Sequence, residues 1–284
     1  MAQALNAVEH DIGGLFVKRL LPNQEKRMVG PFIFFDQMGP SDFPAGQGIN
    51  VRPHPHIGLS TLTYLFEGSI LHRDSLGNHL EIFPGDVNWM TAGKGIVHSE
   101  RETFEVRANK HAISGLQCWV ALPEEMAELE PVFNHVKKQD LPHLIHEGVM
   151  MRLVVGEAYG LSSPVKTYSP MFYIDVAAYE GSKIEKPNPK QEAAIFVVSG
   201  QVYISGAEYS EGEFVLLEDQ DEEILVKKCG RFIMLGGQKF ETVPFIHWNF
   251  VSFKKERIEK AKEDWKNGLF PKIPGDDKEF IPLI

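Results

Sequence analysis

Two pairs of potential metal ligands with the same spacing lie in the first half of the sequence. His54 and His56 are separated by one residue, and His98 and Glu100 repeat this arrangement further along the chain. Residues i and i+2 of an extended strand point to the same face of a sheet, so each pair can direct both of its side chains at one point. If the two strands are neighbours, three neutral imidazoles and one carboxylate can reach a single ion.

This set of side chains favours a transition metal, because Ca²⁺ and Mg²⁺ prefer cages of oxygen ligands. A single pair of histidines at this spacing is more often free of metal than bound to it. The second pair follows a glycine-rich turn at Gly93 and Gly95, and two such pairs make a metal site the better interpretation. The residues alone leave the ion open among Fe(II), Mn(II), Ni(II), Cu(II) and Zn(II).

The other histidines carry weaker signals. His72 and His79 flank the turn at Asp74–Gly77, and a role in that hairpin is a better interpretation than a role as ligands. Cys118 lies in an apolar stretch and is expected to be a buried small side chain and not a nucleophile.

The elements that must position these side chains are short strands. Stretches 60–66, 150–155, 193–198 and 213–217 are rich in Val, Ile, Leu, Phe, Tyr, Thr and other apolar residues, and Gly, Pro or charged turns bound them. Long amphipathic helices do not alternate with these stretches. The pattern predicts a mostly β fold, with many short strands in a sandwich or barrel.

The two halves of the sequence repeat one order of strands and glycine turns. Gly68 and Gly85 in the first half correspond to Gly200 and Gly212 in the second. This repeat indicates an internal duplication and therefore two tandem β-barrel domains. We expect an N-terminal metal-binding domain over 1–135 and a C-terminal domain over 136–284 that ends in a helix and a tail.

The second domain is expected to lack a metal. Aligning the glycine turns places Lys186 and Asn188 where His54 and His56 stand, and Leu225 and Lys227 where the second pair stands. Ammonium groups and a leucine offer no lone pairs to an ion at these positions.

One helix is predicted near the C-terminal end of the sequence. Ile258, Ala261 and Trp265 recur at helical spacing, with Lys and Glu on the other face. Ser252 is expected to cap the helix and Gly268 to end it. Packing of the apolar stripe on the β core is a better interpretation than a partner surface.

Charge, hydropathy and cysteine content argue against several classes of protein. The 284 residues carry 29 basic and 39 acidic side chains, for a net charge of −10, which argues against nucleic-acid binding through bulk charge. No apolar run is long enough to span a bilayer, and no secretory signal is visible. The chain has only 2 cysteines, so we expect a protein of a reducing compartment, the cytoplasm, or also the nucleus in a eukaryote.

Around the two ligand pairs, the sequence resembles the pirin family of the cupin superfamily. The resemblance is carried by Arg-Pro-His-Pro-His-Ile-Gly-Leu at 52–59, Tyr-Leu-Phe-Glu-Gly at 64–68, His-Arg-Asp-Ser-Leu-Gly at 72–77 and the run from Pro84 to Arg101. It continues at 32–38 and 274–283, and so extends over nearly the whole chain.

The resemblance implies a bicupin, with two cupin-type β-barrels and one metal, usually described as iron, in the first barrel. The family's ligands carry over to His54, His56, His98 and Glu100. Other cupins take a glutamate five residues after the second histidine, where this chain has Thr61. That departure agrees with the pirin pattern.

The resemblance also implies an activity. Pirin-family members include quercetin 2,3-dioxygenases, which open a flavonol ring with O₂ and release carbon monoxide. We therefore expect an oxidoreductase with a small aromatic substrate, in which Glu100 loosens from the metal and accepts the hydroxyl proton as a general base. The alternative is a metal- or redox-dependent regulator that binds a transcription factor or a metabolic enzyme without turnover.

Overall fold

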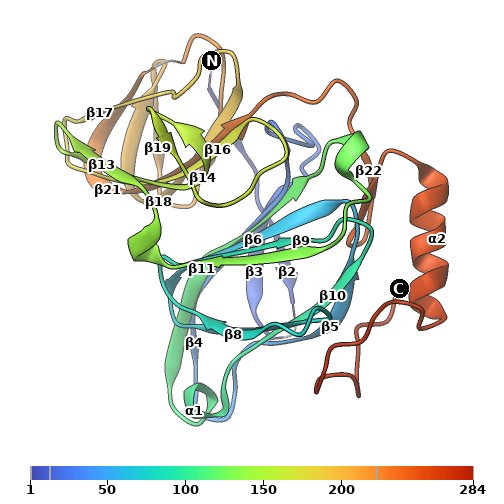
Figure 1. Cartoon of the computed structure of the whole chain (residues 1–284). Coiled ribbons are helices and arrows are strands. Elements are labelled where there is room, and N and C mark those ends of the chain that lie inside the picture. Colours follow the sequence, from blue (N-terminus) through green and yellow to red (C-terminus); the bar gives the residue numbers. More distant parts are fainter. Residues whose placement is uncertain (1, 13, 222, 284) are drawn as a thin grey trace. The chain divides into compact units, whose positions relative to one another are not determined.

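The computed structural model describes residues 2–12, 14–221 and 223–283, which form mostly β-strands, as predicted (Figure 1). Within these residues the longest helix is α2 (Lys255–Lys266), and α1 (Phe104–Arg107), η1 (Glu124–Met126) and η2 (Lys138–Asp140) are single turns. No helix among the described residues is both long and apolar enough to cross a membrane. The chain divides into two compact units, which are described separately.

The first unit, here called the histidine unit, contains Val8–Arg19, Phe34–Lys138 and Thr242–Ile284. Its larger sheet has the order β12-β9-β6-β11-β4-β3-β2, formed by β2 (Val8–Asp11), β3 (Phe16–Leu21), β4 (Phe32–Phe43), β6 (Leu59–Glu67), β9 (Val87–Thr91), β11 (His111–Ala121) and β12 (Val132–Val136). Its smaller sheet has the order β5-β10-β7-β8, formed by β5 (Asn50–His56), β7 (Ile70–Asp74), β8 (His79–Ile82) and β10 (Ile96–Arg101).

The two sheets of the histidine unit share one apolar core. Leu65 and Ile113 from the larger sheet pack with Ile70 and Ile82 from the smaller one, and all four are at most 2% exposed. Burial of such side chains is the main stabilising contribution to a β-sandwich. On β5 and β10, polar side chains face the space between the two sheets. The candidate site lies at these polar positions.

The second unit contains Met1–Ala7, Leu20–Ile33 and Gln139–Glu241. Its sheet has the order β1-β20-β18-β21-β16-β14-β13, with β15, β17 and β19 on side branches. The strands are β1 (Gln3–Leu5), β13 (His143–His146), β14 (Val149–Ala158), β15 (Leu161–Ser162), β16 (Met171–Ala178), β17 (Lys183–Glu185), β18 (Glu192–Ile204), β19 (Ala207–Ser210), β20 (Phe214–Leu217) and β21 (Glu223–Gly237).

The repeated glycine turns have matching backbone conformations in the two units. Gly68 has a φ of +79° and Gly200 of +88°, whereas Gly85 and Gly212 have +85° and +86°. A Cβ atom at Gly68 would lie 2.5 Å from the Ala112 carbonyl oxygen. Only glycine adopts this conformation without strain or overlap, so the repeat read from the sequence is also a repeat of turn geometry.

The units group residues differently from the predicted division at residues 135 and 136. Residues 242–284 group with the histidine unit, whereas Leu20–Ile33 groups with the second unit. Residues 242–284 contact the histidine unit through β23 (Phe250–Ser252), which forms a parallel bridge from Phe250 to Ile57, next to the second histidine of β5.

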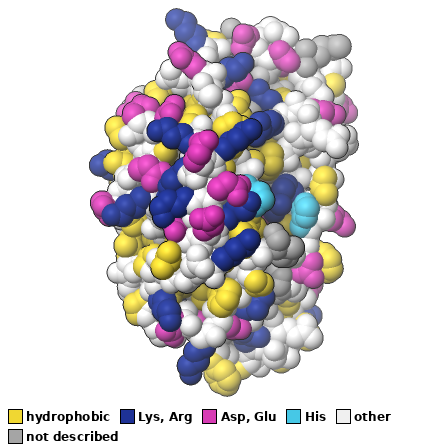
Figure 2. Space-filling view, turned by 90° about the vertical axis from the view of Figure 1, so that its right-hand side faces the viewer, with side chains coloured by type: hydrophobic (Ala, Val, Ile, Leu, Met, Phe, Trp, Pro, Cys, Tyr) yellow, Lys and Arg dark blue, Asp and Glu magenta, His cyan; other side chains and the backbone are white. Residues whose placement is uncertain are grey.

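Helix α2 packs as predicted, but its N-terminal cap differs from the prediction. Ile258 and Ala261 are buried against Ile57 and Phe250. Ser252 instead lies at the end of β23, where its hydroxyl accepts a hydrogen bond from the Lys254 amide. The helix therefore begins later than a Ser252 cap requires. Over α2, Figure 2 shows Lys and Arg interleaved with Asp and Glu, as on a solvated face.

Candidate metal centre

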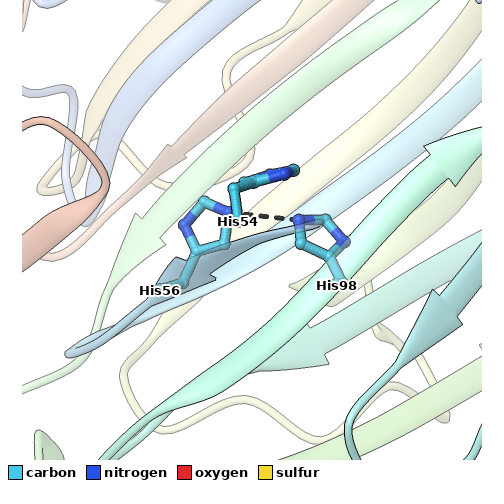
Figure 3. Close-up of side chains that lie close together, drawn as sticks. All are labelled: His54, His56 and His98. Atoms are coloured by element: carbon cyan, nitrogen blue, oxygen red, sulfur yellow. Dashed lines mark hydrogen bonds between the residues drawn. The ribbon is translucent and has the colours of Figure 1, made fainter. Parts of the chain in front are cut away.

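Three histidines meet on the inner side of the smaller sheet of the histidine unit (Figure 3). His54 and His56 come from β5, and His98 comes from the neighbouring antiparallel strand β10, where it is paired with His54. One ring nitrogen of each lies within 4.8 Å of the others. The strand pairing inferred from the two i, i+2 motifs therefore does bring the three imidazoles together.

Two of the ring nitrogens lie at a separation that suits adjacent ligands of one divalent ion. His56 Nε2 and His98 Nε2 are 3.1 Å apart, close to the separation of about 3.0 Å for adjacent ligands at right angles on an ion with bonds of about 2.1 Å. Two neutral imidazoles approach so closely only when a proton or a cation lies between their lone pairs. The three histidines are thus a candidate site for a divalent metal.

The tautomer of His54 is fixed by the backbone. Its Nδ1 lies 2.8 Å from the Arg52 carbonyl oxygen, to which it donates a hydrogen bond. The Nε2 lone pair is then left free to bind an ion, the arrangement found in most metal-binding histidines. This bond lies at a β-bulge, where β5 has one more residue than β10 between the pairs His98–His54 and Glu100–Val51.

Burial keeps the three imidazoles neutral, which is the form that binds metals. His54, His56 and His98 are 6%, 1% and 1% exposed. The pKa of His54 is lowered to about 4, mainly by desolvation and also by neighbouring His72, while the Arg52 carbonyl opposes the change. Desolvation also lowers the pKa values of His56 and His98 well below the ordinary value, and the neighbouring imidazoles act in the same direction.

We expect the metal-free protein to lose stability as the pH falls from 6.5 to 4. In that window the unfolded chain binds protons on these histidines and the folded chain does not, so acid favours unfolding. For His54 alone, the pKa of about 4 corresponds to a loss of about 2 kcal/mol between pH 7 and pH 5. Urea unfolding of chelator-treated protein at both pH values measures this loss. Equal stability at the two values would contradict the burial of neutral histidines.

Glu100 lies beside the three histidines and not among them. Its carboxylate is outside the 4.8 Å cluster, and Thr63 Oγ1 lies 3.3 Å from its Oε1. Thr63 Oγ1 is also 2.8 Å from Oε1 of Gln117. Burial raises the pKa of Glu100, while His72 and the Thr63 hydroxyl offset part of that increase. The carboxylate is thus on the same side of β10 as His98, with raised basicity.

The sequence interpretation missed a second pair at this site, His72 and Asp74. His72 is 3% exposed, and its Nε2 lies 3.0 Å from Asp74 Oδ2. Strand β7 pairs with β10 so that His72 lies opposite Glu100 and Asp74 opposite His98. Asp74 also accepts hydrogen bonds from Leu76 and Asn78, so the expected hairpin role is present as well. The i, i+2 spacing of His72 and Asp74 was the available signal.

Aromatic side chains form the wall of the site on the larger sheet. The Trp119 ring lies 5.1 Å from the His56 ring and stacks on Phe34 at 4.0 Å. On another side, Phe133 stacks on His72 at 4.4 Å. Thr61 is buried. The site therefore combines nitrogen ligands, a carboxylate and flat apolar surfaces.

The corresponding region of the second unit has different chemistry. Lys186 is 6% exposed, and its Nζ lies 3.4 Å from the Pro189 carbonyl oxygen. The Asn188 side chain accepts a hydrogen bond from the Lys190 amide. Ile184, two residues before Lys186, belongs to the large apolar core of this unit.

We expect Lys186→Ala to leave the metal content unchanged. The substitution removes an ammonium group that binds a backbone carbonyl, and the candidate ligands belong to the other unit. Elemental analysis of the purified variant measures the metal per chain. A clear fall in metal content, with the fold intact by circular dichroism, would show that the second unit contributes to the site.

Comparison with known proteins agrees with these features. The Pirin family pattern matches residues 14–120, and the Pirin C-terminal cupin domain pattern matches residues 173–271. A pirin-like protein of Caulobacter vibrioides is 46% identical, over 98% of this chain and 97% of its own length. Pirin of Homo sapiens is 32% identical, over 89% of this chain and 87% of its own.

A solved structure extends the match to the fold. Quercetin 2,3-dioxygenase from Acinetobacter baumannii superimposes with a TM-score of 0.91 and 36% identity, over 100% of this chain and 95% of that one. Two cupin domains, one of which carries three converging histidines, define a bicupin. The chain belongs to the pirin family.

Proposed function

We propose that the chain is a quercetin 2,3-dioxygenase with one divalent metal ion, held by His54, His56, His98 and Glu100. The proposed ion is Fe(II), and Mn, Ni, Cu and Zn are the alternatives. The observation that carries this proposal is the convergence of three buried, neutral imidazoles with two ring nitrogens 3.1 Å apart. The likeness to the Acinetobacter baumannii quercetin 2,3-dioxygenase supports the choice of reaction.

The metal, when bound, supplies a Lewis acid that lowers the pKa of a coordinated flavonol hydroxyl. Glu100 then accepts the hydroxyl proton, a role that suits a carboxyl whose pKa is raised by burial. A movement of the carboxylate from Thr63 toward the histidines would make Glu100 a ligand in one state and a base in the other.

The surrounding side chains suit a flat substrate. Trp119 and Phe34 are stacked near His56, and Phe133 covers His72. Aromatic rings bind other rings through offset-stacked or edge-to-face contacts. A flavonol such as quercetin and O₂ are therefore the proposed substrates. Neither Cys118 nor Cys229 forms a disulfide, and the proposed compartment is the cytoplasm.

Oxygen uptake with quercetin tests the proposal. Protein stripped with a chelator is divided and reloaded with Fe(II), Mn(II), Ni(II), Cu(II) or Zn(II), and uptake is followed with an oxygen electrode. The proposal predicts no turnover in the stripped sample and the fastest turnover with iron. Tight binding of one metal without uptake for any ion would favour the metal-dependent regulator instead, and partner capture with oxidised and reduced protein would follow.

A further inference from the structure

The segment 268–283, here called the tail segment, lies against the outer side of the sheet that carries the histidines. In β10 the side chains of His98 and Glu100 point inward, so Ser99 and Arg101 between and after them point outward. Both outward side chains bind Asp276 of the tail segment. The strand that supplies a ligand on one face is thus held by the tail on the other.

The contacts of Asp276 form a compact set of charge-assisted hydrogen bonds. Its Oδ2 accepts bonds from Ser99 Oγ at 2.7 Å and from Arg101 Nε at 2.9 Å, and its Oδ1 accepts one from Arg101 Nη2 at 2.9 Å. Glu279 accepts a further bond from Arg101 Nη2. The Arg101 and Asp276 side chains are 18% and 10% exposed. Bidentate, partly buried pairs of this kind fix geometry more firmly than exposed ion pairs.

The tail segment also binds the other histidine strand. The Ile281 amide donates a hydrogen bond to the Pro53 carbonyl at 2.9 Å, and Pro53 immediately precedes His54. The Trp265 indole of α2 in turn donates to the Ile281 carbonyl at 3.0 Å. The tail segment thereby connects β5, β10 and α2.

We propose that the tail segment positions the metal ligands and that Asp276 is its main positioning residue, an inference that rests on the proposed metal site. Asp276 does not reach the ion. It fixes β10 through Ser99 and Arg101, while Ile281 fixes β5. Metal sites depend on the groups that hold their ligands in place, and the loss of a hydrogen bond made directly to a ligand weakens metal binding by about 10–100-fold. Asp276 and Ile281 hold the strands and not the ligands, so the loss of either should weaken metal binding by less.

Asp276→Asn tests the proposal with Co(II) as the probe. The variant keeps the shape of the side chain but removes the charge that binds Arg101. Co(II) affinity, measured by competition with a chelator, is expected to fall by up to about 10-fold, the lower end of the effect of a contact made directly to a ligand. The visible absorption of bound Co(II) is expected to shift in position and intensity, because ligand geometry changes. A role in folding alone would leave that spectrum unchanged.

Asp277→Asn is the matched control. Asp277 is adjacent to Asp276 and exposed. The Co(II) affinity of the Asp277→Asn variant and the absorption spectrum of its bound Co(II) should therefore equal those of the unsubstituted protein. Ser99→Ala is a milder variant that removes a single bond to Asp276, and it should weaken Co(II) binding in the same direction. If Asp276→Asn does not fold, Ser99→Ala decides alone. Unchanged affinity and spectrum in the variants would overturn the positioning role, whereas failure of the unsubstituted protein to bind Co(II) would overturn the metal site itself.

Discussion

Replacing His56 with alanine is expected to abolish stoichiometric metal binding and flavonol turnover together. His56 Nε2 lies 3.1 Å from His98 Nε2, so the substitution removes one of the three nitrogens that converge. Loss of a supporting contact already costs about 10–100-fold in metal affinity, and loss of a ligand should therefore cost more than about 100-fold. Elemental analysis after gel filtration measures the metal that remains.

His79→Ala provides the matched control for this result. His79 is an exposed histidine of β8 in the same unit, so the variant should keep its metal and its turnover. Turnover that survives in His56→Ala after the metal is lost would contradict a metal-dependent reaction. Full metal content in that variant would place the ion elsewhere in the chain.

Replacing Glu100 with glutamine should separate metal binding from turnover. Three histidines remain, and Glu100 is a proposed ligand in only one of its two states, since its carboxylate bonds Thr63 in the structure. Metal affinity should therefore fall far less than in His56→Ala. Turnover of quercetin should fall by about 10²–10⁴-fold, the usual contribution of a general base. Steady-state rates of metal-loaded protein, corrected for metal content, measure this effect.

Glu105→Gln is the control for the removal of one carboxylate, because Glu105 is exposed on α1. It should leave both metal content and rate unchanged. An unaltered rate in Glu100→Gln would exclude Glu100 as the base. It would favour His72 in that role, which lies opposite Glu100 on β7.

The local parts of this site could be predicted from the sequence because strand periodicity is local. The i, i+2 spacing of His54 and His56 determines which face their side chains share, whatever the rest of the chain does. The glycine turns at Gly68 and Gly200 require a positive φ that few other residues adopt, so the internal repeat was also visible.

The parts that depend on distant pairings could not be predicted. His72 lies at the site only because β7 pairs with β10 in one register, and neither strand specifies that register by itself. The hydrogen bonds from Ser99 to Asp276 and from Ile281 to Pro53 join residues far apart in sequence. The predicted Ser252 cap was wrong because tertiary pairing placed Ser252 in β23, before α2 begins.

The central claim is that a metal held by His54, His56, His98 and Glu100 allows this chain to open a flavonol with O₂. The most direct test is the amount of carbon monoxide released per quercetin consumed, with ¹⁸O₂, by protein reloaded with Fe(II) under anaerobic conditions. We predict one carbon monoxide per quercetin and both ¹⁸O atoms in the ring-opened product, with none of either in metal-free protein. Stoichiometric iron without carbon monoxide or ¹⁸O in the product would contradict the claim.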